Sequence, residues 1–263
     1  MARRQFMTRR PPMLLLPALV LALAVTAGAP SAQADRPVPF KAGEVLTYDV
    51  SWTTFLTAGS MTMSVKERQV GAGGARYYLV AEGAPSSTLR KLYALYYKAE
   101  SMLDTRTLRP TVSTMYSDEN GRKRHKISTF RGNGRVDYEV RTASVSKSTV
   151  TVDPTAQDAL SVIYVLRALP LAPGQRPFVV PVVDSGKSYS MRVTVAGRES
   201  VKTGIGTLPA VKLTLAVTNV NDRAAGTDTL TLWMSDDARR LPLKVQAGLA
   251  VGSVQLTLAR VTG

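Results

Sequence analysis

The chain has 263 residues and no cysteine, so disulfides, thiolate metal sites and cysteine nucleophiles are all excluded. Its 34 basic and 19 acidic residues give a net charge of +15, which favours anionic partners such as lipid headgroups, lipopolysaccharide or acidic polymers. A high net charge also keeps proteins soluble without any specific partner. Composition therefore leaves open whether the charge serves binding or solubility.

The first 34 residues have the order of features found in a secretory signal peptide. Four arginines precede an apolar run from Met13 to Ala27, and Ala32-Gln33-Ala34 forms a small-x-small cleavage site. A membrane anchor would need about 20 apolar residues, and Pro17 interrupts the run. Without cysteine the chain cannot be lipidated at the cleavage site. We therefore expect a soluble periplasmic protein that is not a lipoprotein, exported by the Sec or the twin-arginine route, with no nucleic acid partner.

Much of the remaining chain alternates between apolar and polar side chains, the pattern of half-buried strands in an antiparallel sheet. The pair Asn120-Gly121 predicts a tight hairpin, because both residues tolerate positive φ. Residues 86–97 fit either a short amphipathic helix or a strand, since tyrosine is common in strands. The predicted strands are 46–52, 61–66, 76–81, 98–104, 111–118, a strand opening at 122–126, 136–140, 178–183, 189–195, 211–217, 229–234, 243–247 and 254–261.

One long helix is predicted from Pro154 to Leu169. Its apolar residues recur at i, i+3, i+4 and i+7, which gives one stripe that faces a core. Its start is signalled either by Asp153 as a cap or by a capping box of Thr155 and Asp158, and Pro170 ends it.

Strands on both sides of a single helix, with no βαβ alternation, predict a mainly β fold. We expect a curved antiparallel sheet or a partly open β-barrel packed around this central helix. Residues 35–263 are predicted to form one such domain after a signal peptide at 1–34.

The sequence predicts no catalytic, metal or cofactor site. His125 is the one histidine and lies among cations, and no G-x-S-x-G motif occurs. The pair Asp236-Asp237 is better explained as a turn held by nearby arginines than as a pair of catalytic acids. A buried carboxylate on the helix would need a partner such as Arg167 or Arg192. The residues expected to be structural are Asp158, Ser161, Tyr164, Arg167, Asp236, Asp237 and Arg240.

Several aromatic and methionine side chains could line an apolar cavity, where methionine adapts to different acyl chains. Basic residues of the 120–121 hairpin could hold an anionic headgroup at its mouth. An ordinary β core and a charged edge strand would explain the same residues. Replacing Tyr93 or Tyr96 is expected to lower ligand uptake. The candidate ligand-binding residues are Trp52, Met61, Met63, Tyr93, Tyr96, Tyr97, Arg122, Lys123 and Arg124.

A series of short motifs in a fixed order resembles a known family. The chain reads G-E-x-L-x-Y-x-V-x-W at 43–52, Y-K-A-E-S at 97–101, Q-D-A-L-S-x-x-Y-x-x-R at 157–167, D-x-G-K-x-Y at 184–189 and W-x-S-D-D-x-x-R-x-P at 233–242. From Phe40 to about Val261 it is similar to the exported bacterial proteins of domain-of-unknown-function family 3108. This resemblance implies an exported, mainly β protein with no established activity, and it transfers no catalytic residue.

The layout is also similar to that of periplasmic lipid and lipoprotein carriers, in which a curved sheet wraps helices around an apolar cavity. We therefore expect a non-enzymatic binding or carrier protein for an amphiphilic, lipid-like and anionic ligand, with no cofactor. The alternative is an envelope-assembly module that binds a protein or polymer through a basic hairpin or sheet edge. A hydrolase acting through Asp236 or Asp158 is the least favoured hypothesis, because no second convergent acid or usable histidine is evident.

Overall fold

The computed structural model describes residues 34–53, 56–71, 74–92, 94–248 and 252–263. The described strands belong to a single sheet of 15 strands, accompanied by two short α-helices and one 3₁₀ turn. The strands are β1 (Val45–Trp52), β2 (Leu56–Gly71), β3 (Gly74–Pro85), β4 (Leu95–Asp104), β5 (Pro110–Glu119), β6 (Arg122–Phe130), β7 (Arg135–Arg141), β8 (Val145–Thr151), β9 (Gln157–Asp158), β10 (Phe178–Asp184), β11 (Lys187–Thr203), β12 (Gly206–Asn219), β13 (Thr227–Ser235), β14 (Pro242–Gly248) and β15 (Ser253–Thr262). The helical elements are α1 (Ser87–Leu92), α2 (Ser161–Ala168) and η1 (Arg223–Ala225).

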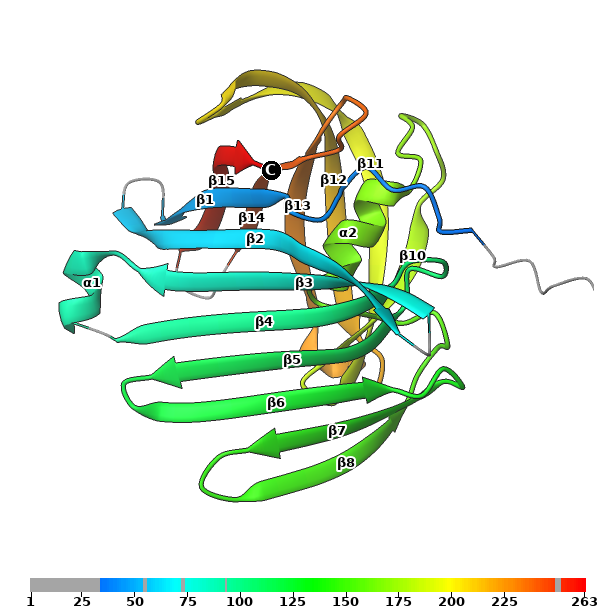
Figure 1. Cartoon of the computed structure of the whole chain (residues 1–263). Coiled ribbons are helices and arrows are strands. Elements are labelled where there is room, and N and C mark those ends of the chain that lie inside the picture. The colour runs from blue at the N-terminus through cyan, green and yellow to red at the C-terminus, as the bar shows by residue number, and fades with distance from the viewer. Residues whose placement is uncertain (1–33, 54–55, 72–73, 93, 249–251) are drawn as a thin grey trace, which may run out of the picture. The chain divides into compact units, whose positions relative to one another are not determined.

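The sheet consists of two antiparallel meanders, β1 to β8 and β10 to β15, which meet in the middle where the first strand pairs with the last. β1 pairs with β2 on one side and with β15 on the other, so β8 and β9 are the two outermost strands. The pairing of β9 with β10 is parallel, and the hairpins along both halves of the sheet are antiparallel. In Figure 1, β2 to β8 run across the view, and β10 to β13 cross behind them. The predicted fold class is confirmed as one large open sheet, in which the helix is a minor element.

The predicted central helix begins later than expected. Residues 154–155 form a turn, Gln157 and Asp158 form the short strand β9, and α2 covers Ser161–Ala168 only. The backbone N–H of Ser161 donates to Asp158 Oδ1, and Ser161 Oγ accepts from the Asp158 N–H at 2.9 Å. This reciprocal pair satisfies free N–H groups at the helix start, as in a capping box. The predicted starts at Asp153 and at Thr155 are therefore wrong.

Two apolar clusters line the inner face of the sheet, and α2 packs against both. Tyr164 belongs to the first cluster, which includes Leu46 of β1 and Leu79 of β3. Val162 and Leu166 belong to the second, which draws on β10 to β13. The helix therefore fills the space between the two halves of the sheet at one end of the inner face.

The long hairpin of β11 and β12 covers one end of the first cluster. Val201 and Ala210 are buried in that cluster, and the Gly204 N–H donates to the Leu258 carbonyl of β15 at 2.8 Å. A Cβ on Gly204 would lie 2.4 Å from the carbonyl oxygen of Ala259, so only glycine permits this approach.

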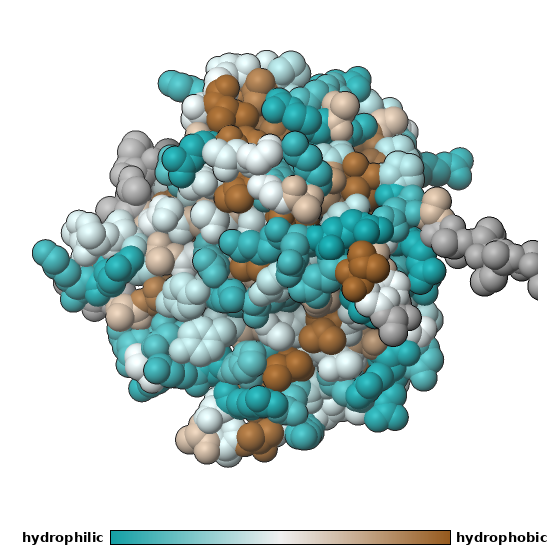
Figure 2. Space-filling view, viewed as in Figure 1, coloured by the Kyte–Doolittle hydropathy of each residue, from teal (hydrophilic) through white to brown (hydrophobic). Residues whose placement is uncertain are grey.

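Other elements agree with the predictions in part. Asn120 and Gly121 form the β5–β6 turn with φ of 51° and 81°, which confirms the predicted hairpin. The segment 86–97 holds both alternatives, the short helix α1 followed by the start of β4. β8 was not predicted, and β11 extends well beyond the expected 189–195. On the face shown in Figure 2, hydrophobic side chains are scattered among hydrophilic ones, which fits a wet outer face on β2 to β8.

Candidate ligand-binding cavity

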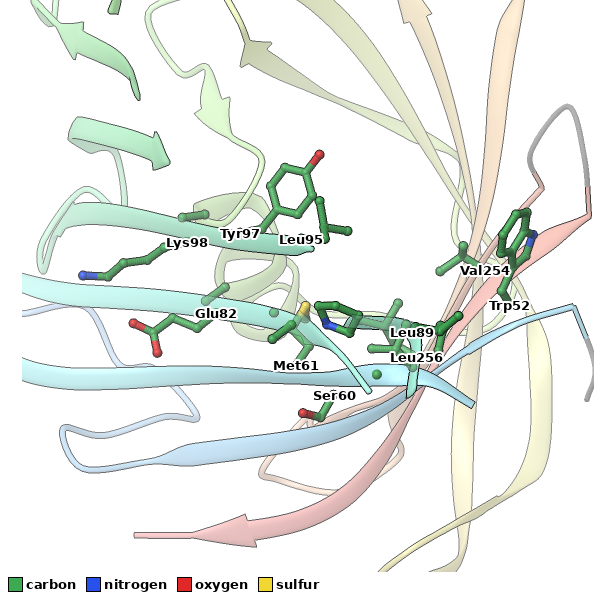
Figure 3. A pocket seen from close by; sticks show the side chains of 18 of the residues that line it. Trp52, Ser60, Met61, Glu82, Leu89, Leu95, Tyr97, Lys98, Val254 and Leu256 are labelled. Carbon is green, nitrogen blue, oxygen red and sulfur yellow. The ribbon is translucent and has the colours of Figure 1, made fainter. Parts of the chain in front are cut away.

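An apolar cavity of about 630 Å³ lies between strands of the first half of the sheet and β15 (Figure 3). Its volume is within the range of about 300–1,000 Å³ found for small-molecule sites. Leu89 of α1 also contributes to the wall. The lining residues are Val50, Trp52, Ala58, Gly59, Ser60, Met61, Ala81, Glu82, Gly83, Ala84, Pro85, Leu89, Leu95, Tyr97, Lys98, Ala99, Met115, Val254 and Leu256.

The cavity exists because small residues follow large ones along the inner face. On β3 the inward positions are Tyr77, Leu79, Ala81 and Gly83. The first two are buried in the core near α2, whereas the next two line the cavity. On β4, Ala99 pairs with Ala81 and also leaves space. The core therefore ends along the strands where side-chain volume falls, and the cavity begins there.

The charged residues at the cavity wall turn away from it. Glu82 and Lys98 lie next to Gly83 and Ala99, and successive side chains of a strand point to opposite faces. In Figure 3 their carboxylate and ammonium groups extend away from the Tyr97 and Leu95 side chains. These two residues therefore border the cavity mainly through backbone atoms, and its interior is apolar.

Three of the candidate ligand-binding residues meet at this cavity. Trp52 at the end of β1, Met61 on β2 and Tyr97 on β4 all line it. The Tyr97 hydroxyl donates to Glu119 Oε1 at 2.5 Å, which fixes the ring beside the β5–β6 turn. The fold thus brings Tyr97 to the same cavity as Trp52, which is 45 positions earlier in the sequence, and Met61, which is 36 positions earlier.

Of the three other aromatic or methionine candidates, two lie away from the cavity and the third is not among the described residues. Met63 is only 3% exposed and belongs to the core next to Leu46, because it is one step closer to α2 than Met61. Tyr96 lies on the outer face, with its ring 6.1 Å from that of Tyr116. Tyr93 lies outside the described residues.

The three basic hairpin candidates divide between the two faces of the sheet. Arg124 pairs with Ser117, which pairs with Tyr97, so these three residues share the inner face. Arg122 is on the same face, two residues earlier, whereas Lys123 lies between them and faces outward. None of the three lines the cavity itself, and all are exposed.

Asp158 is fully buried and is held by neutral groups. Its Oδ1 accepts the backbone N–H groups of Leu160 and Ser161, each at 2.8 Å, and its Oδ2 accepts Ser101 Oγ at 2.6 Å. Burial raises the pKa of the Asp158 carboxyl above its ordinary value, and these hydrogen bonds oppose that shift. The expected arginine partner is wrong, because the bond to Ser101 ties β9 to β4 instead.

Arg167 pairs with a residue that the sequence did not suggest. Its Nη1 and Nη2 donate to the two carboxylate oxygens of Glu44 at 2.5 and 2.8 Å, and Arg167 is 1% exposed. The guanidinium lies 5.4 Å from the Phe40 ring centroid and 5.5 Å from that of Tyr164. Burial raises the pKa of the Tyr164 hydroxyl above its ordinary value. This group joins α2 to the segment before β1.

The carboxyl groups of Asp236 and Asp237 are engaged in the turn between β13 and β14. Asp237 Oδ1 accepts Ser235 Oγ at 2.6 Å and the Arg240 N–H at 3.2 Å, and Asp236 pairs with Arg198 at 2.6 Å. Although burial raises it, hydrogen bonds from Ser235 and neighbouring Arg239 hold the pKa of Asp237 below its ordinary value. The two carboxyl groups thus bind separate partners and do not share a proton or a cation between them.

In the part of the chain that the structure describes, no group of three or more histidine, aspartate or glutamate side chains is arranged to hold a metal ion. Within the same residues, no helix has the length and apolar character needed to cross a bilayer.

The residues that create the cavity were not predicted from the sequence. The predicted candidates were large aromatic and methionine side chains, whereas the space itself is left by the small residues Gly83, Ala81 and Ala99. The available signal was a fall in side-chain size at alternate positions of neighbouring strands, from Tyr77 and Leu79 onward.

Comparison with known proteins agrees with this architecture. The sequence model of one family, described as "Protein of unknown function (DUF3108)", matches residues 47–259, as the motifs suggested. Comparison with curated proteins yields no match.

A solved structure of similar fold is the beta-barrel-like protein of domain of unknown function DUF1849 from Brucella abortus. It has a TM-score of 0.56 and 10% identity, over 83% of this chain and 96% of that chain. A protein with a YmcC-like fold from Bacteroides fragilis has a TM-score of 0.38 and 12% identity, over 88% and 100% of the two chains. The lipoprotein LppX from Mycobacterium tuberculosis has a TM-score of 0.25 and 11% identity, over 83% and 85%. Only the first likeness is close enough to support the fold, and we base nothing on the other two.

Proposed function

We propose that this chain, which belongs to the DUF3108 family of proteins of unknown function, is a non-enzymatic binding or carrier protein for an amphiphilic, lipid-like ligand. We further propose that residues 1–34 direct its export to the periplasm and that residues 35–263 act there as one soluble domain. The observation that carries the proposal is the apolar cavity of about 630 Å³ on the inner face of the sheet.

The energetics of apolar burial support an acyl chain as the occupant. Each buried methylene contributes about 0.8 kcal/mol, so about ten methylenes contribute roughly 8 kcal/mol. That gain is of the same order as the cost of immobilising a ligand, about 4–15 kcal/mol. Met61 and Met115 in the wall have flexible side chains that adapt to chains of different length.

Two adjacent tyrosines provide a matched test of the cavity. Tyr96 and Tyr97 are 37% and 39% exposed, but only Tyr97 lines the cavity. We expect Tyr97→Ala to weaken binding of the methyl ester of dansyl-undecanoic acid by about five- to tenfold, through lost apolar contact. Tyr96→Ala, on the outer face, should change the Kd less than about twofold. Fluorescence titration of both variants measures this difference.

A filling variant extends the same test. A Cβ on Gly83 would meet only ordinary contacts, with Met61 Cγ at 3.8 Å, so Gly83→Leu should fold and place its side chain in the cavity. We expect this variant to lose ester binding while its thermal unfolding stays cooperative. Ester binding by a folded Gly83→Leu variant with wild-type affinity would reject the cavity as the binding site.

A second candidate function is an envelope-assembly module, which is favoured by the exposed edge of the sheet. β8 is an outermost strand, and most of its residues are exposed. Edge strands of this kind can pair with a strand of another protein. The even-numbered residues of β8 bond to β7, so the N–H of Lys147 points to the free edge. Lys147→Pro would block pairing there. Loss of partner pull-down in this variant, with ester binding intact, would favour the assembly function.

A further inference from the structure

The inner face of β6 carries a row of cations beside the apolar cavity. Arg122, Arg124 and Lys126 occupy alternate positions, so they share one face of the strand. Their neighbours on β5 in the same row are Glu119, Ser117 and Met115, and Met115 lines the cavity. Arg124 is thus two strands from Tyr97, a separation of about 10 Å between backbones.

The row differs from the outer face of the adjacent strands, where charges are neutralised. There Arg135 and Arg141 of β7 each pair with a carboxylate of their own strand, Asp137 or Glu139. Among the described residues, Arg122 and Arg124 take part in no ion pair. Glu119 lies opposite Arg122 on the same face and accepts the Tyr97 hydroxyl, so it supplies one negative charge against the three cations of the row. The row therefore keeps a net positive charge.

Lys126, deeper in the same row, has a protein partner. Its Nζ donates to Ser185 Oγ at 2.7 Å, in the turn between β10 and β11. The two arginines closer to the β5–β6 turn are exposed, so a bound group can reach them from solvent. Two guanidinium groups therefore lie on the inner face of the sheet, two strands beyond the cavity wall formed by Leu95 and Tyr97.

We propose that Arg122 and Arg124 bind the acidic headgroup of an amphiphile whose chain occupies the cavity. This assignment rests on the proposed carrier function and narrows it to acids, either carboxylates or phosphate monoesters. Guanidinium groups form paired, charge-assisted hydrogen bonds with both kinds of anion. Lys123, which the sequence grouped with the two arginines, faces the opposite side and takes no part.

The test compares an acid with its neutral ester on variants of adjacent residues. Dansyl-undecanoic acid and its methyl ester are titrated into the full chain after signal removal. The variants are Arg124→Gln, the double variant Arg122→Gln/Arg124→Gln, and the control Lys123→Gln, which removes one charge from the outer face. We expect the double variant to bind the acid about tenfold more weakly or worse, since it loses charge-assisted hydrogen bonds. Ester binding by that variant and acid binding by Lys123→Gln should change less than about twofold.

Each outcome separates the headgroup assignment from the carrier function. If the double variant retains wild-type affinity for the acid, or loses acid and ester equally while folded, the headgroup assignment is overturned and the cavity stands. If wild type binds neither probe, the carrier function fails and the headgroup assignment fails with it.

A competition arm identifies the source of the anion. Dodecyl phosphate should displace the bound acid probe at concentrations where inorganic phosphate does not. Equal displacement by inorganic phosphate would show a site for the free anion and contradict an amphiphile headgroup. Thermal unfolding of each variant without probe confirms that the proteins compared are folded.

Discussion

The carboxyl of Asp158 is buried against Ser101 and two backbone N–H groups, and it forms no ion pair with any residue that the structure describes. Its pKa is raised above the ordinary 3.8 because burial disfavours the charged form. The native state therefore holds this proton more tightly than the unfolded chain does. The stability that Asp158 contributes is complete below the ordinary carboxyl pKa and is lost as the pH rises through the raised native pKa.

Asp158→Asn tests this linkage, because an amide keeps the acceptor for the backbone N–H groups and cannot ionise. We expect the free energy of unfolding of the variant, minus that of wild type, to be larger at pH 7 than at pH 4. Urea unfolding at the two pH values measures the difference. Asp153→Asn is the control of opposite sign, since hydrogen bonds from Thr155 lower the pKa of Asp153. The same pH dependence in wild type and Asp158→Asn would show that this carboxyl does not titrate differently on folding.

At the scale of single elements, α2 is held in place by one buried ion pair. Arg167 binds Glu44 through both terminal nitrogens and also donates to the Arg239 carbonyl at 3.1 Å. Removing one partner of a buried pair leaves the other charge unpaired. We therefore expect Arg167→Met to lower the free energy of unfolding by about 3–5 kcal/mol.

The matched control for this prediction is an exposed arginine pair. Arg198 of β11 pairs with Asp236 at 2.6 Å and has a side chain 56% exposed, so Arg198→Met should cost no more than about 1 kcal/mol. Urea unfolding of both variants at pH 7 provides the comparison. Adding Glu44→Gln to Arg167→Met should restore part of the loss. Similar costs for Arg167→Met and Arg198→Met would contradict the anchoring role of Arg167.

Local pattern predicted most strands, and it failed where the pattern was weak or ambiguous. β8 has the sequence VSKSTVT, whose small and polar residues give little hydrophobic alternation, so it was missed. The helix was predicted too long because an apolar stripe alone does not distinguish buried extended chain from helix. Its real start is set by the reciprocal bonds of Asp158 and Ser161, and the residues before it pair with β10 as the short strand β9.

At the scale of the whole domain, hairpin signals suggest which neighbouring strands pair, but they do not show how the sheet closes on itself. The pairing of β1 with β15 joins residues more than 200 positions apart, such as Val50 and Leu256. It places Trp52 beside Val254 and so completes the cavity wall. The cavity depends on this long-range register and on the small size of the residues at Ala81 and Gly83. The hydrophobic periodicity of a single strand predicts neither of these features.

The central claim is that the cavity holds a lipid-like amphiphile. The most direct measurement is to purify the exported protein without detergent, extract it with organic solvent and analyse the extract by mass spectrometry. We predict an amphiphile with an acyl chain and an acidic headgroup, at about one molecule per chain and absent from the Gly83→Leu variant purified in the same way. An empty wild-type protein that also fails to take up added dansyl-undecanoic acid would contradict the carrier function and favour the assembly module.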